Sequence, residues 1–170
     1  MSEYSALFSI PAEFVTSRAR LSPGELAYGY SRGWLGDAAA ISVAEHLVAT
    51  GTTPEPILEL ASVFGQEHWR VEQILGEIEG KEVSDQVWLY LALDWLHDHR
   101  YEHAEPLEII AALYADFGYP KDTDSLVYYM PAPPGAPTGA GVLEEAWEEY
   151  LRQKRSEYAN RRTSNDTDEA

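Results

Sequence analysis

Three histidines interleaved with acidic residues form the one group in the sequence with the chemistry of a metal site. His97, His99 and His103 follow Asp94 at the end of an apolar stretch. On a continuous helix His99 and His103 would share a face, as i and i+4 ligands do, whereas His97 would point elsewhere. A solvated helix end, where imidazolium groups interact with the negative end of the helix dipole, explains them more simply. We therefore expect no metal and no cofactor, and the alternative is a metal-dependent enzyme that uses Asp94, His97, His99 and His103.

The other titratable pairs do not predict a catalytic site. Glu45 precedes His46 and Glu67 precedes His68, but adjacent residues of a helix point apart and cannot relay a proton. The chain has no Gly-x-Ser-x-Gly motif, no phosphate-binding glycine loop and no cysteine. The residue types that remain favour binding over catalysis.

Asp94 is the one acidic residue inside the most apolar stretch, 87–96. A buried carboxylate without a partner costs roughly several kcal/mol, so this side chain needs one. A catalytic acid is one reading, but an ion pair is the commoner role of such a residue. The sequence offers Arg32, Arg70 and Arg100 as partners.

A second segment, 114–131, combines tyrosines with aspartates. Gly118, Pro120 and Pro131 favour irregular chain there. Tyrosines beside aspartates are typical of protein-binding surfaces. The same aromatic side chains can instead pack as a plug that closes a small helical core, and we expect this packed role first. The candidates for contact with a partner are Asp116, Tyr119, Asp122, Asp124, Tyr128 and Tyr129.

Net charge limits the classes of partner. The chain has 29 aspartates and glutamates against 12 lysines and arginines, a formal net charge of -17. Phosphate backbones are repelled by such a surface, which argues against a nucleic-acid-binding role. A basic protein partner fits, because complementary fields accelerate association. A surface that only keeps the protein soluble explains the charge equally directly.

The elements that must position these residues are helices. Ser22 and Glu25 have the spacing of a capping box, and Gly29 and Gly33 suggest either close approach by a neighbour or early termination of the helix. Apolar residues at helical spacing, Leu58 and Trp69 among those expected to be buried, predict an all-α fold. About seven helices are expected, near 22–32, 38–50 (capped by Asp37), 54–65, 66–79, 87–96, from 106 through at least 113, and 142–158.

One domain, 1–160, is predicted from the chain length. An Ala/Pro/Gly-rich connector, 131–141, precedes the last helix, and the polar tail 161–170 is expected to be disordered. The start of the chain lacks the pattern of a signal peptide. No apolar run approaches the roughly 20 residues that cross a bilayer. We expect a cytoplasmic protein.

Four stretches in order carry a family resemblance, with spacing that fits: 26–35, 58–61, 88–96 and 114–120 with 129–131. Together they resemble the small bacterial proteins grouped as the domain-of-unknown-function 2247 family, over roughly Ser22 to Leu151. The resemblance implies no catalytic residues. Small size, helical build and acidity favour an immunity-type inhibitor that binds a basic toxin. A helical scaffold or adaptor is the further alternative.

Overall fold

The protein is described here by a computed structural model that covers residues 9–51, 54–78, 85–127, 134–135 and 139–167; side chains at 140 and 160–167 lie outside the description. Helices are the only regular elements among these residues, so the all-α prediction is confirmed. The α-helices are α1 (Ala12–Arg18), α2 (Pro23–Ser31), α3 (Asp37–Ala49), α4 (Glu55–Ala61), α5 (Trp69–Gly76), α6 (Gln86–Asp98), α7 (Pro106–Asp116) and α8 (Ala140–Thr167). Short 3-10 helices are η2 (Gly65–Glu67), η4 (Arg100–Glu102) and η5 (Lys121–Leu126).

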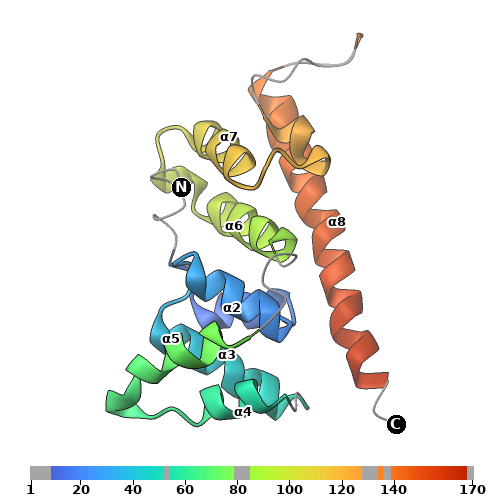
Figure 1. Ribbon diagram of the computed structural model, residues 1–170. Coiled ribbons are helices and arrows are strands. Elements are labelled where there is room, and N and C mark those ends of the chain that lie inside the picture. Colours follow the sequence, from blue (N-terminus) through green and yellow to red (C-terminus); the bar gives the residue numbers. More distant parts are fainter. Residues whose placement is uncertain (1–8, 52–53, 79–84, 128–133, 136–138, 168–170) are drawn as a thin grey trace.

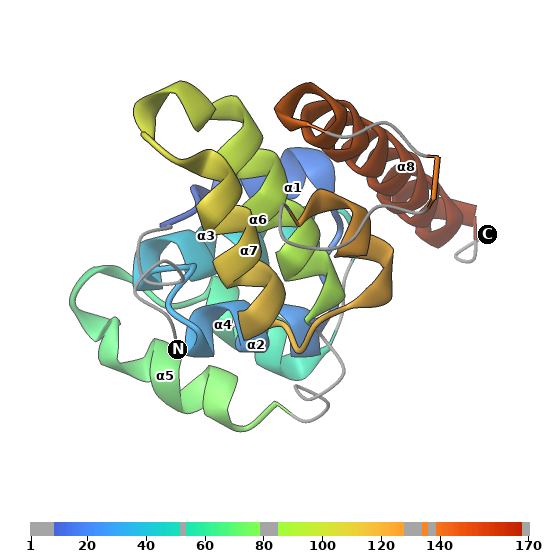
Figure 2. The same cartoon turned by 90° about the horizontal axis from the view of Figure 1, so that it is seen from above.

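The helices form two groups with α8 along their side. Figure 1 shows α2 to α5 at one end and α6 with α7 at the other, and the long α8 extends past both. Viewed from above, α8 lies at one edge of the molecule, next to α1 and α6 (Figure 2). It contacts α1, α6 and η5. The last helix therefore docks on the rest of the chain, as predicted.

Helix α6 is the central element, as its nearly uniform apolar surface predicts. Every residue from Val87 to Asp94 is buried. The indole N–H of Trp88 donates to the carbonyl oxygen of Glu25 on α2 at 2.6 Å. The indole N–H of Trp147 on α8 donates to the carbonyl oxygen of Leu93 at 3.2 Å. Helices from both sides are thus bonded to α6 through buried tryptophans.

Helix α2 begins at the predicted capping box. The Ser22 hydroxyl accepts from the backbone N–H of Glu25 at 3.2 Å, and the Glu25 carboxylate accepts from the backbone N–H of Ser22 at 2.8 Å. Further along, Gly29 lies against the Trp88 ring, where an added Cβ would sit 2.0 Å from Cζ2. Of the two alternatives, close approach holds at Gly29, whereas Gly33 lies beyond the end of α2 and a Cβ added there would meet nothing within 4 Å.

Several expectations from the pattern were wrong. Helix α1 was not predicted, because it is seven residues long and buries one large apolar side chain, Val15. Leu58 is 42% exposed and Trp69 is 69% exposed, although both were expected in the core. Trp69 precedes Val71 by two residues and so lies on the opposite side of α5 from the buried Val71, Ile74 and Leu75.

The remaining differences lie at the ends of elements. Asp37 does not cap α3: no side chain caps this helix at its N-cap residue Gly36. The segment after Tyr119, where irregular chain was expected, begins with η5, and residues 128–131 lie outside the described residues. Helix α8 continues past the expected end near Tyr158 to Thr167. The predicted disordered tail was 161–170. Of these residues, 161–167 belong to the end of α8, without described side chains, and 168–170 lie outside the described residues.

Replacing Gly29 by alanine is expected to destabilise the fold by about 3 kcal/mol, since the added methyl group must displace a buried tryptophan ring. Urea-induced unfolding measures the free energy of unfolding. Gly76→Ala is the matched control, because its Cβ would meet open space within a helix. Equal stability of the two variants would contradict the packing described for Gly29.

Candidate binding surface

The end of α7 is a Schellman motif built from the predicted aromatic segment. The backbone N–H of Gly118 donates to the carbonyl of Ala115 at 3.1 Å, and that of Tyr119 donates to the carbonyl of Tyr114 at 2.9 Å. Gly118 has φ 76° and Tyr119 has φ 59°. The rings of Tyr114 and Tyr119 meet edge to face with centroids 5.2 Å apart, which supplies the apolar contact that accompanies this motif.

Tyr119 occupies a backbone conformation that side chains disfavour. A residue other than glycine in the left-handed region costs roughly 1–2 kcal/mol. Its side chain is nevertheless 60% exposed, so burial of the ring does not account for a tyrosine at this position. The fold therefore holds an aromatic side chain at the surface on a strained and well-defined backbone.

The aspartates of the same segment have partners within the chain. Asp124 accepts a short hydrogen bond from the Tyr114 hydroxyl. The exposed Asp122 lies 3.3 Å from Nζ of Lys154 on α8. Asp116 is half-buried. Leu126 and the Thr123 side chain are buried, so the described part of the segment packs as a plug with an exposed outer side.

Two of the six predicted contact residues, Tyr128 and Tyr129, lie outside the described residues. Of the other four, Tyr119 and Asp122 are exposed. These two are the described residues of the predicted surface that present the most area to a partner.

The histidines do not converge. Helix α6 ends at Asp98 and His103 has an extended backbone, so His99 and His103 do not share a helical face. His99 Nδ1 lies 2.8 Å from the carbonyl oxygen of Trp95. His97 packs edge-on against Trp147, with ring centroids 4.8 Å apart. Within the described ranges, no three histidine, aspartate or glutamate side chains are placed to hold a metal ion.

Asp94 is fully buried and each carboxylate oxygen has its own arginine. Oδ2 lies 2.8 Å from Nε of Arg18 on α1, and Oδ1 lies 2.9 Å from Nη2 of Arg155 on α8. The three partners suggested by the sequence, Arg32, Arg70 and Arg100, were wrong. The hydrogen bond to Asp94 raises the pKa of Arg155. Burial, and then the charge of Asp94, raises the pKa of Tyr90 on the same helix.

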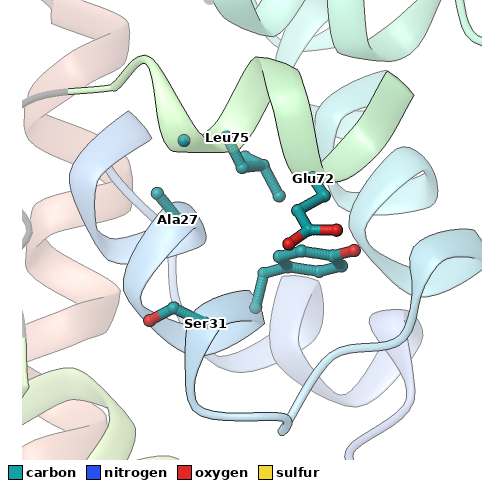
Figure 3. A pocket seen from close by; sticks show the side chains of 6 residues that line it. Ala27, Ser31, Glu72 and Leu75 are labelled. Carbon is teal, nitrogen blue, oxygen red and sulfur yellow. The ribbon is translucent and has the colours of Figure 1, made fainter. Parts of the chain in front are cut away.

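A cavity of about 490 Å³ opens between α2 and α5. Figure 3 shows Glu72 reaching down from α5, with Leu75 beside it on the same helix and Ala27 on α2. The Tyr30 hydroxyl, in the same wall, donates to Oδ1 of Asp37 at 2.7 Å. The cavity is lined by Ala27, Tyr30, Ser31, Glu72, Leu75 and Gly76.

Burial raises the pKa of Tyr30 to about 12, and Asp37 and Glu72 add to the shift. Among the described residues, Glu72 is the one charged residue that lines the cavity. Sequence reasoning missed this site, because residues of two separate helices form it and no motif links them. Asp37, which bonds to Tyr30 in the cavity wall, was predicted as a helix cap instead.

Two large apolar side chains are exposed at or just before the start of α5. Phe64 is 74% exposed and precedes η2, and the exposed Trp69 is the first residue of α5. Arg70 lies 3.3 Å from both Glu59 and Glu67, so its charge is balanced. Exposed aromatic and acidic side chains therefore occur together around η2 and the start of α5.

A protein-family model matches residues 12–155, from the first residue of α1 to the arginine that contacts Asp94 from α8. Its description is "Uncharacterized protein conserved in bacteria (DUF2247)". The chain belongs to this family. The resemblance read from the sequence is confirmed, and the DUF2247 match extends beyond the 22–151 expected. No curated protein and no solved structure matches the chain.

The DUF2247 match includes both arginines of the Asp94 site and every described residue of the two candidate surfaces. No helix in the described part of the chain is long and apolar enough to span a membrane.

Asp94→Asn is expected to lower the free energy of unfolding by about 3 kcal/mol, because it removes the charge that balances two arginines. Arg155→Gln should cost less, since Arg18 still pairs with Asp94. Glu149→Gln, which breaks an exposed pair with Arg152, is the control and should cost under about 0.5 kcal/mol. Chemical denaturation gives all three values. A stability for Asp94→Asn like that of the control would contradict the role assigned to Asp94.

Alkaline pH should weaken the fold through Tyr30. Its pKa is raised from 10.0 to about 12 in the folded state, so the protonated hydroxyl contributes stability that is complete below pH 10 and lost as pH rises toward 12. Unfolding measured between those limits should show the advantage of wild type over Tyr30→Phe shrinking. A difference that does not change with pH would show that the phenol titrates normally.

Proposed function

We propose that this chain is a noncatalytic protein-binding domain, an immunity-type inhibitor that neutralises a basic bacterial toxin by direct binding. The observation that carries the proposal is Tyr119, an exposed tyrosine on a left-handed backbone fixed by the Schellman motif. Strained residues that are held in place by their surroundings concentrate at functional sites. Tyrosine is also among the residues that contribute most to protein interfaces.

Charge supports a basic partner. The net charge of -17 attracts a cationic protein over long range and raises the association rate. Asp122 stands on the same segment as Tyr119 and is exposed beside Lys154. It can exchange this internal partner for a lysine or arginine of the toxin. The inhibitor would thereby cover a basic active site or substrate groove, and would act in the cytoplasm.

The rival reading, a metal-dependent enzyme, gains no support from the geometry. Its proposed ligands are separated by the end of α6, and Asp94 already uses both oxygens on arginines. Metal analysis of protein purified without a histidine tag keeps this alternative testable: stoichiometric zinc, iron or manganese would favour it over the inhibitor.

The decisive experiment tests the products of the genes directly beside this one for a toxin. Expression of the toxin in a bacterial host should stop growth, and co-expression of this chain should restore it. Isothermal titration calorimetry with the purified pair should give a 1:1 complex. Growth arrest that co-expression does not relieve, together with no heat of binding, would exclude the immunity role for that pair.

Tyr119→Asn separates binding from folding. Asparagine tolerates the left-handed backbone, so relief of strain offsets the lost ring contact and stability should change by no more than about 1 kcal/mol. Affinity for the toxin should fall about 30-fold, the effect of losing a hot spot. Tyr101→Asn removes another exposed tyrosine, on η4, and should leave affinity unchanged. Equal affinities of the two variants would place the interface elsewhere.

A further inference from the structure

We propose that the cavity between α2 and α5 binds a cationic side chain, the tip of a lysine or arginine, presented by a protein partner. The inference rests on the proposed function insofar as the partner is a basic protein. It adds a second contact surface, on a different pair of helices from Tyr119. The cavity is large enough for such a side chain, at about 490 Å³.

The polar wall of the cavity suits a cation. Tyr30 contributes an aromatic ring, whose face attracts an ammonium or guanidinium group. Its hydroxyl donates a hydrogen bond to Oδ1 of Asp37 at 2.7 Å, which limits movement of the ring. Glu72 extends into the space from the facing helix (Figure 3) and supplies the opposite charge. A ring and a carboxylate on two walls of one cavity are the two groups that recognise a cationic tip.

The charges near the cavity are negative, as binding of a cation requires. Asp37 is bonded to the Tyr30 hydroxyl and Glu72 lines the same cavity, so two carboxylates lie near the ring, and both add to the rise that burial causes in the pKa of Tyr30. The nearest arginine of α5, Arg70, is balanced by Glu59 and Glu67. Ala27, Leu75 and Gly76 give the cavity an apolar portion, which fits the methylene groups of a long cationic side chain.

The surroundings of the cavity can hold the rest of a partner. Trp69, Glu72 and Gly76 follow one another at i, i+3 and i+7 on α5, so the exposed tryptophan lies one turn from the carboxylate on the same face. Phe64, which directly precedes η2, is a second exposed aromatic side chain in this part of the chain. Aromatic residues are enriched at protein interfaces, so these two side chains suit contact with a partner.

The test uses small cations as probes, so that it does not depend on the toxin. Two-dimensional NMR of the isotopically labelled chain would follow n-butylammonium, n-butylguanidinium and neutral 1-butanol. One or both cations should produce saturable shifts of the backbone amides of Tyr30, Glu72 and Gly76, with a Kd in roughly the millimolar range for so few atoms. The cation that binds more tightly identifies lysine or arginine as the preferred side chain.

Variants show whether the carboxylate is responsible. Glu72→Gln should weaken binding of the cation about tenfold. Glu77→Gln makes the same change of charge one residue beyond α5, away from the cavity lining, and should have no effect. Shifts of equal size with 1-butanol, shifts confined to other regions, or an equal loss in both variants would overturn the proposal.

Failure of this site is distinguishable from failure of the proposed function. If the toxin binds and the cations do not reach the cavity, the cavity proposal is wrong and the inhibitor stands. If the cations bind as described and no toxin is neutralised, the cavity is a cation site and the immunity role is wrong. Trp69→Ala should weaken the toxin complex several-fold while leaving the butylammonium Kd unchanged, which a cavity unrelated to the interface would not produce.

Discussion

The buried charge of Asp94 is the constraint on which the arrangement of the helices depends. A carboxylate at the centre of an apolar helix cannot remain unpaired, and here each oxygen takes an arginine from a different part of the chain. Arg18 belongs to α1 and Arg155 to α8, so one side chain joins the first helix, the central helix and the last. Replacement by apolar residues can match such a site in stability, so we interpret its role as fixing which helices meet α6.

The remaining contacts build outward from that centre. Trp88 and Trp147 bond to main-chain carbonyls across the helix boundaries, and Gly29 allows the Trp88 ring to lie against α2. With the core set in this way, the two surfaces that we propose for binding lie outside it. One is the end of α7, where a capping motif turns a tyrosine outward, and the other is the open cavity between α2 and α5. Both combine aromatic side chains with acidic ones, in keeping with the charge of the whole chain.

Local patterns predicted local structure well, and failed where distant residues meet. The capping box of Ser22 and the close approach at Gly29 depend on near neighbours or on the missing side chain itself. Arg18 is 76 positions from Asp94, and no spacing rule selects it over other arginines. Trp69 was expected in the core with the other apolar residues at helical spacing, but it lies on the opposite side of α5 from the buried Val71, Ile74 and Leu75. The cavity could not be predicted for the same reason as Arg18, since it exists only once two helices pack.

The Asp94 site also bears on how the chain acquires its fold. Arg155 lies 61 positions after Asp94 in the sequence, so synthesis completes α6 well before its second arginine exists. Until α8 arrives, closing the core around α6 would bury a carboxylate with one oxygen unmatched, which opposes early compaction. Contacts between distant positions also slow folding, because the intervening loop must close first. We therefore expect the core to close only after the last helix has been made, and a nascent chain that stops short of α8 to leave the side of α6 that contacts Trp147 open to solvent.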